Sequence, residues 1–96
     1  MRKLHLSVAA AEDLENILQY TLDIWGETQY QKYIGSLEKN FDLLQTDPEK
    51  PIFKKREVLF PGCKSVRSSH HVIFFRIVNN DIEIIRILHE KMDFPG

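Results

Sequence analysis

The spacing of apolar residues changes about half-way along the chain. Between residues 8 and 46, apolar side chains recur every three or four positions, a spacing that gives an α-helix one apolar face. His71–Val78 and Ile82–Leu88 are instead rich in β-branched and aromatic residues, which favour strands. A chain of 96 residues has room for one helical layer on one sheet, so this order predicts a single α+β domain over residues 1–96.

Ser7 marks the predicted start of the first helix, because its side-chain oxygen can accept a hydrogen bond from a first-turn amide. Gly26 suits the C-terminal cap of the same helix. Leu4–Leu6, directly before Ser7, is short and apolar and could form an edge strand. The apolar stripe between the two caps consists of Leu14, Ile17, Leu18, Thr21, Ile24 and Trp25.

A second helix is predicted to start at Thr28, since Thr28 and Gln31 have the spacing of a capping box. Asp47-Pro48 ends it, because proline cannot continue a helix. Gly35 in its interior marks either a close helix crossing or a tolerated loss of helix propensity. The short link predicts an antiparallel αα-hairpin over about residues 8–46. The apolar positions of the second helix are Tyr30, Ile34, Leu37, Phe41 and Leu44.

The second half of the chain predicts a sheet over about residues 58–88, followed by a tail at 89–96. Val58–Phe60 and Lys64–Arg67 are short strand candidates on either side of a Pro-Gly turn. Asn79-Asn80 suits a two-residue hairpin loop, because asparagine tolerates a positive φ. The predicted order is β-α-α-β-β-β, with the helical hairpin packed on one face of an antiparallel sheet.

With that loop, Arg76 lies opposite Glu83, and this pair of opposite charges supports the register. Two helices can cover only one face of the sheet, yet both faces of the predicted hairpin carry apolar residues. The uncovered face therefore indicates a site for a partner, unless Val58–Phe60 or the tail folds over it. The expected pairs on that face are Phe74 with Ile85 and Val72 with Ile87, and His71 faces Leu88. The face expected in the core holds Ile73, Phe75, Ile77, Ile82 and Ile84.

No motif in the chain is typical of an enzyme. The four histidines lack the spacing of metal ligands, so neither a metal nor another cofactor is expected. Cys63 is the single cysteine, so no internal disulfide can form. No base that could activate its thiol is recognisable beside it in the sequence. One catalytic alternative stays open, a metal-independent ribonuclease in which cations stabilise developing charge and histidines exchange protons. Its candidate residues are His71, Arg86, His89 and Lys91.

The charges of the chain are nearly balanced but unevenly distributed. The 13 basic and 14 acidic residues give a net charge of −1, which speaks against a general nucleic-acid-binding protein. Residues 1–49 carry 4 of the basic and 9 of the acidic residues, so a basic contact surface is expected on the sheet. No apolar run approaches the ~18 residues of a membrane span, and no signal peptide is recognisable.

Short motifs run in one order from Leu4 to Asp93. The N-terminal motifs are Leu6-Ser7-x-x-Ala10, Asp13-Leu14-x-x-Ile17-x-x-Tyr20 and Trp25-Gly26. The C-terminal motifs are His71-Val72-Ile73-Phe74-Phe75-Arg76, Ile82-x-Ile84-x-Arg86-Ile87-Leu88-His89 and Met92-Asp93. Each motif is degenerate alone, but together they resemble the ParE-type toxins of the RelE/ParE superfamily, the plasmid-stabilisation toxins.

The resemblance implies a toxin of a type II toxin–antitoxin module in the bacterial cytoplasm, neutralised in a hetero-oligomer with its cognate antitoxin. ParE-type toxins are thought to inhibit DNA gyrase and stop replication. RelE-type relatives cut messenger RNA on the ribosome and usually carry a tyrosine or histidine near the C-terminus. No tyrosine follows His89 here, so gyrase inhibition without enzymatic activity is expected. A RelE-like endoribonuclease and an inactive antitoxin-binding module are the alternatives.

Two sets of residues are expected to carry these contacts. Contacts with gyrase, without direct sequence-specific binding of nucleic acid, are expected from Arg67, His70, Arg76, Arg86, His89, Lys91 and Met92. Contacts with the antitoxin are expected from Trp25 and from the uncovered sheet face, at Val72, Phe74, Ile85 and Ile87.

Overall fold

The computed structural model describes residues 2–57 and 61–91. The predicted strand Val58–Phe60 and the tail from Met92 onward lie outside these residues. The elements follow one another as β1 (Leu4–Leu6), α1 (Val8–Trp25), α2 (Glu27–Thr46), β2 (Lys54–Lys55), β3 (Lys64–Ser68), β4 (His71–Val78) and β5 (Asp81–His89).

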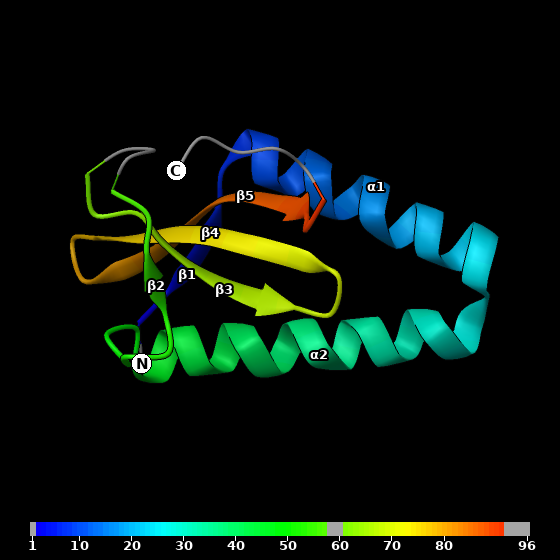
Figure 1. Cartoon of the computed structure of the whole chain (residues 1–96), viewed down its shortest axis with the longest axis horizontal. Coiled ribbons are helices and arrows are strands. Elements are labelled where there is room, and N and C mark those ends of the chain that lie inside the picture. The colour runs from blue at the N-terminus through cyan, green and yellow to red at the C-terminus, as the bar shows by residue number, and fades with distance from the viewer. Residues whose placement is uncertain (1, 58–60, 92–96) are drawn as a thin grey trace.

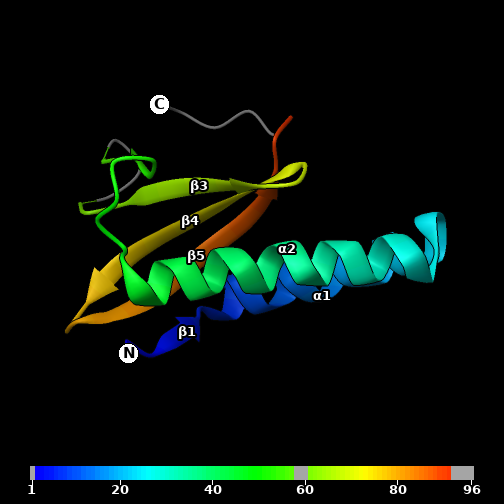
Figure 2. The ribbon, with the colours of Figure 1, turned by 90° about the horizontal axis from the view of Figure 1, so that it is seen from below.

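The two helices form an antiparallel hairpin on one face of the sheet (Figures 1 and 2). Both figures show the helices continuing well beyond the end of strands β3 to β5, so the tip of the hairpin overhangs the sheet. The predicted α+β architecture of a helical hairpin on a sheet is therefore confirmed. The strand order is β1-β5-β4-β3-β2.

The sheet is mixed, because β1 pairs parallel to β5 with Leu4 opposite Ile82 and Leu6 opposite Ile84. The expectation of a wholly antiparallel sheet was wrong for this strand. A parallel pair needs a long crossover connection, and the helical hairpin begins that crossover directly after β1. The short strand β2 was also not predicted, since two exposed lysines carry no strand pattern.

The structure confirms the caps of α1. Ser7 Oγ accepts a hydrogen bond from Ala10 N at 3.0 Å, and Gly26 N donates to Leu22 O at 3.1 Å. The predicted capping box at Thr28 was wrong, because α2 already begins at Glu27 and no side chain caps it. A single glycine with φ +84° separates the two helices, so Gly26 serves as C-cap of one and N-cap of the other.

A β-bulge in β5 changes the register between β4 and β5. The predicted pairing holds from the loop to Phe75, which lies opposite Ile84, but Phe74 lies opposite Arg86. The extra residue is Ile85, whose carbonyl accepts a hydrogen bond from Ser7 Oγ at 2.7 Å. The expected pairs Phe74 with Ile85, Val72 with Ile87 and His71 with Leu88 were therefore wrong. The observed pairs are Ile73 with Ile87, Val72 with Leu88 and His71 with His89.

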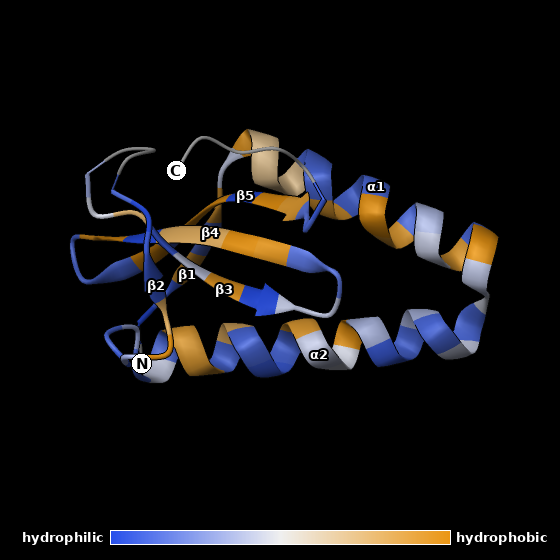
Figure 3. Ribbon diagram, viewed as in Figure 1, coloured by the Kyte–Doolittle hydropathy of each residue, from blue (hydrophilic) through white to orange (hydrophobic). Residues whose placement is uncertain are grey.

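The bulge exchanges the faces of the residues that follow it. Ile87, expected on the open face, is 1% exposed and belongs to the core under the helices. Phe74 is only 6% exposed, because it packs with Cys63, Leu88 and Val72 in a second apolar cluster. Figure 3 shows apolar residues concentrated on β4 and β5, with alternating character along both helices. The main core includes Tyr33, Leu37, Leu44, Phe53, Ile73, Phe75, Ile82, Ile84 and Ile87.

Candidate functional site

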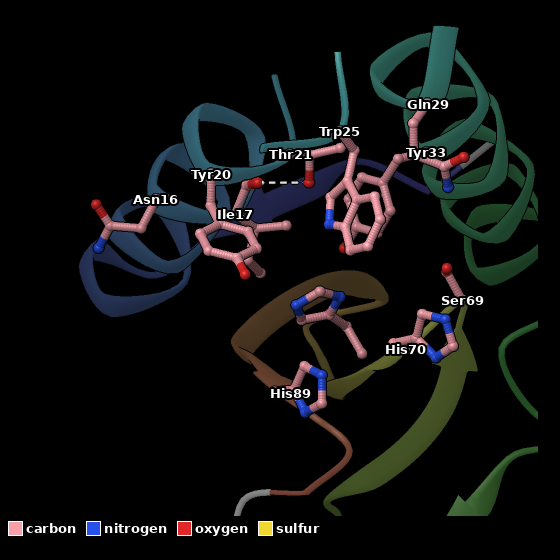
Figure 4. A pocket seen from close by; sticks show the side chains of 11 residues that line it. Asn16, Ile17, Tyr20, Thr21, Trp25, Gln29, Tyr33, Ser69, His70 and His89 are labelled. Atoms are coloured by element: carbon pink, nitrogen blue, oxygen red, sulfur yellow. Dashed lines mark hydrogen bonds between the residues drawn. The ribbon is translucent and has the colours of Figure 1, made fainter. Parts of the chain in front are cut away.

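A cleft of about 620 Å³ lies between the helical hairpin and the end of the sheet. The α1 and α2 helices supply one wall, and the ends of β4 and β5 with the turn before β4 supply the other (Figure 4). The lining residues are Asn16, Ile17, Tyr20, Thr21, Trp25, Gln29, Tyr33, Ser69, His70, His71 and His89.

Aromatic side chains dominate the helical wall of this cleft. Figure 4 shows Tyr20, Trp25 and Tyr33 on the helical side, facing His70 and His89 across the opening. Tyr20 is 60% exposed and Trp25 66% exposed, whereas Tyr33 is 4% exposed at the base of the hairpin overhang. The cleft therefore combines accessible rings at its mouth with a buried ring in its wall.

The structure brings His71 and His89 together at the end of the sheet, as expected from the sequence. They pair directly across β4 and β5, and their ring centroids lie 5.4 Å apart at an interplanar angle of 83°. Tyr33 packs edge-on against His71 with a centroid distance of 5.4 Å. The three rings thus form one continuous aromatic contact from α2 to β5.

Burial determines the protonation states of His71 and Tyr33. Desolvation, together with the nearby imidazoles of His89 and His70, lowers the pKa of His71 to about 4. Desolvation also raises the pKa of Tyr33 to about 12. Both rings are therefore neutral at pH 7. Tyr33 Oη and His71 Nδ1 are buried and have no hydrogen-bond partner within the part of the chain that the structure describes.

An ion-pair group lies at the sheet-side rim. The carboxylate of Glu90 pairs with the guanidinium of Arg67 and lies 3.4 Å from His70 Nδ1. Lys91 is exposed, and its backbone N–H donates to His89 Nδ1 at 3.1 Å. Four of these residues, Arg67, His70, His89 and Lys91, are expected gyrase contacts, and the geometry brings them together beside the cleft.

Arg86 lies away from this group, against α1. Its Nε and Nη2 atoms donate to Asp13 at 2.8 and 2.9 Å, and the Ile87 N–H donates to the same carboxylate. Burial opposes ionisation of Asp13, but the hydrogen bonds from Arg86 and Ile87 hold its pKa below the ordinary value. Arg76 is likewise paired, with its Nε 2.7 Å from Glu83. The catalytic set His71, Arg86, His89 and Lys91 is thus not gathered at one point.

Other chemistry has little support among the described residues. Burial raises the pKa of the Cys63 thiol, which disfavours the nucleophilic thiolate. Within residues 2–57 and 61–91, no group of three or more histidine, cysteine or acidic side chains could hold a metal ion. Neither helix of that same part of the chain is long and apolar enough to cross a membrane.

Sequence reasoning missed the helical wall of the cleft, apart from Trp25. The heptad-like pattern pointed to Tyr30 as the inward tyrosine, whereas Tyr33 is the buried one. Tyr20 and Trp25 are accessible because they lie beyond the sheet, and no sequence pattern reveals how far a hairpin overhangs. Val72 and Ile85 are half-buried, so only part of the expected antitoxin face is accessible.

The sequence profile described as "ParE toxin of type II toxin-antitoxin system, parDE" matches residues 4–94. The chain belongs to the ParE toxin family. The curated Toxin ParE of Escherichia coli is 36% identical over 89 residues, which cover 92% of this chain and 84% of that ParE. The fold of the present chain is also similar to the folds of solved structures whose sequences are much less similar to it.

One such structure is the chromosomal ParDE TA system from P. aeruginosa, with a TM-score of 0.73 and 22% identity. The match covers 93% of this chain and 96% of that one. The isolated Escherichia coli RelE toxin matches with a TM-score of 0.62 and 14% identity, over 97% of this chain and 88% of that toxin. Both comparisons agree with the fold of two helices on a five-stranded mixed sheet.

Proposed function

We propose that this ParE-family toxin arrests growth by binding DNA gyrase in the bacterial cytoplasm, and that it is not a ribonuclease. The observation that carries the proposal is the pairing of the sheet arginines. Arg67, Arg76 and Arg86, which include every arginine of β3, β4 and β5, each form an ion pair with a carboxylate. Cleavage of RNA needs a cation that is available to the developing charge on phosphate, and pairing with carboxylates makes these arginines less available, so this arrangement favours a binding protein.

The proposed gyrase contacts lie at the end of the sheet beside the cleft. His70, His89 and Lys91 are exposed there, and Arg67 is exposed next to them. Arg86 is better explained as a residue that fixes α1 on β5, because Asp13 holds both ends of its guanidinium fork. Arg76, which does not line the cleft, remains a proposed contact, as does Met92, which lies outside the described residues.

The cognate antitoxin is the second proposed partner, and we infer that it uses the tip of the helical hairpin. The exposed apolar side chains Tyr20, Ile24 and Trp25 gather near the end of α1, whereas Phe74 and Ile87 are buried. Apolar rings exposed on a small protein are typical of a protein–protein interface. Trp25→Ala should weaken antitoxin binding at least tenfold, while Val8→Ala, an exposed aliphatic residue at the other end of α1, should leave it unchanged.

The order in which DNA synthesis and protein synthesis stop after induction tests the gyrase proposal. When the chain is expressed without its antitoxin, pulse-labelling should show that DNA synthesis stops before protein synthesis does. A ribonuclease acting on translated messages would stop protein synthesis first. Growth that continues with abundant folded protein would instead indicate an inactive, antitoxin-binding module.

A ribonuclease is the second candidate, favoured by the contact between His71 and His89. His71, which its lowered pKa keeps neutral, could accept a proton while His89 supplies one, which is the division of roles that RNA cleavage requires. Primer extension on transcripts from induced cells would then show discrete cuts within translated codons, absent for His89→Ala. Intact transcripts during growth arrest would remove this candidate.

A further inference from the structure

The aromatic cleft has no cationic side chain of the lysine or arginine type among its lining residues. The helix that forms much of its wall is acidic and carries no basic residue, because its only charged side chains are Glu12, Asp13, Glu15 and Asp23. An acidic helical wall attracts a cation more than an anion. The charge of the α1 wall therefore favours a cationic occupant on that side, opposite Arg67 and Lys91 at the sheet-side rim.

The rings of the cleft provide a surface that suits a cation with a flat face. Tyr20 and Trp25 are exposed at the mouth, and the electron-rich faces of such rings attract cations. An arginine guanidinium is planar, so it can stack on a ring and still donate hydrogen bonds in its own plane. An aliphatic side chain would fill the same volume without using the polar atoms of the site.

Two of those polar atoms have no hydrogen-bond partner among residues 2–57 and 61–91. Tyr33 Oη is buried in a side chain that is 4% exposed, and His71 Nδ1 is buried beside it. Buried polar atoms in native proteins almost always have a hydrogen-bond partner, so these two atoms point to a ligand with donors. The tyrosine oxygen and one nitrogen of a neutral imidazole can both accept from a guanidinium.

We propose that this cleft binds the arginine side chain of a partner protein, with its guanidinium stacked on Trp25 and hydrogen-bonded to Tyr33. Binding of an arginine side chain in this cleft does not require gyrase to be the target of the chain. Continued gyrase activity in the presence of the chain would therefore leave this proposal standing, and failure to bind arginine would leave the gyrase proposal standing.

Trp25 is the only tryptophan of the chain, so its fluorescence reports on the cleft alone. The probe is a capped leucine–arginine–leucine tripeptide, and the matched control replaces arginine by citrulline, which keeps the shape and removes the charge. We expect a saturable change in fluorescence with the arginine peptide and an affinity about fivefold lower for the citrulline peptide. Equal affinities would overturn the proposal.

Variants separate specific binding from a nonspecific effect on the tryptophan. Tyr33→Phe removes only the buried hydroxyl and should weaken binding of the arginine peptide about threefold to tenfold. Val8→Ala, at the far end of α1, should not change it. The proposal is wrong if Tyr33→Phe binds as tightly as the parent chain. It is also wrong if fluorescence shows no saturable change up to about 10 mM, which would nearly saturate a site with a Kd of about 1 mM.

Discussion

Asp13 in α1 holds two consecutive residues of β5 at once, the guanidinium of Arg86 and the backbone N–H of Ile87. The three hydrogen bonds are 2.8 to 3.0 Å long and reach the strand directly after the bulge at Ile85. The contact therefore holds α1 against the part of β5 whose pairing with β4 the bulge has shifted. It also removes Arg86 from the set of cations that could act on a phosphate.

Asp13→Ala should lower the free energy of unfolding by about 2 to 3 kcal/mol, because it leaves a guanidinium and a backbone amide without their acceptor. Urea denaturation followed by circular dichroism measures this change. Glu83→Gln is the matched control, since the more exposed pair of Glu83 with Arg76 should be worth less than about 1 kcal/mol. Equal losses for the two variants would show that Asp13 has no special role in holding α1 on β5.

Ser7→Ala should destabilise the fold by about 1 to 2 kcal/mol, at the upper end for a helix cap. The hydroxyl of Ser7 accepts from the Ala10 amide and donates to the Ile85 carbonyl, so one substitution removes a cap and a contact with the bulge. Ser7→Thr keeps a hydroxyl and should recover most of the loss. If the alanine variant unfolds at the parent urea midpoint, Ser7 does not support the bulge.

The two helical glycine positions should respond in opposite directions to alanine. Gly26 has φ +84° and ψ 179°, a conformation that is essentially confined to glycine, so Gly26→Ala should cost about 1 to 3 kcal/mol. Gly35 lies inside α2 with no atom within 4 Å of an added Cβ, so Gly35→Ala should stabilise by about 0.5 to 1 kcal/mol. Thermal unfolding of both variants measures the contrast. A destabilised Gly35→Ala would indicate a close helix crossing that this structure lacks.

Stability should fall as the pH decreases from about 6.5 to 4, because His71 has a lowered pKa in the folded chain. Between these values the unfolded chain binds a proton that the folded chain does not, so protonation favours unfolding. The expected loss is about 2 kcal/mol, measured from urea unfolding at pH 7 and at pH 4.5. His71→Phe retains a ring without a proton equilibrium and should remove most of this loss. An unchanged loss in that variant would place the titration elsewhere.

The sequence predicted the elements of the fold better than the details of their pairing. Ser7, Gly26 and the apolar stripe predicted α1 because local propensity and capping act within one turn of helix. The bulge at Ile85 could not be predicted, since an almost continuous apolar strand has similar residues in either register. The parallel pairing of β1 also leaves no local signal in three residues.

The candidate site, too, was predicted only in part. His71 and His89 were expected to meet because both lie at the end of paired strands, and the bulge places them directly opposite one another. The expected open face around Phe74 was wrong, because Cys63 and Leu88 pack against it. Tyr20 and Tyr33 were not recognised, since the cleft depends on the overhang of the hairpin, and the overhang depends on where the sheet ends.

The most direct test of the proposed function is the supercoiling of relaxed plasmid by purified gyrase and ATP, with folded chain added in molar excess. We predict that supercoiling stops or that linear, gyrase-cleaved DNA accumulates, and that addition of the cognate antitoxin restores activity. Complete supercoiling at every concentration of folded chain would contradict the account.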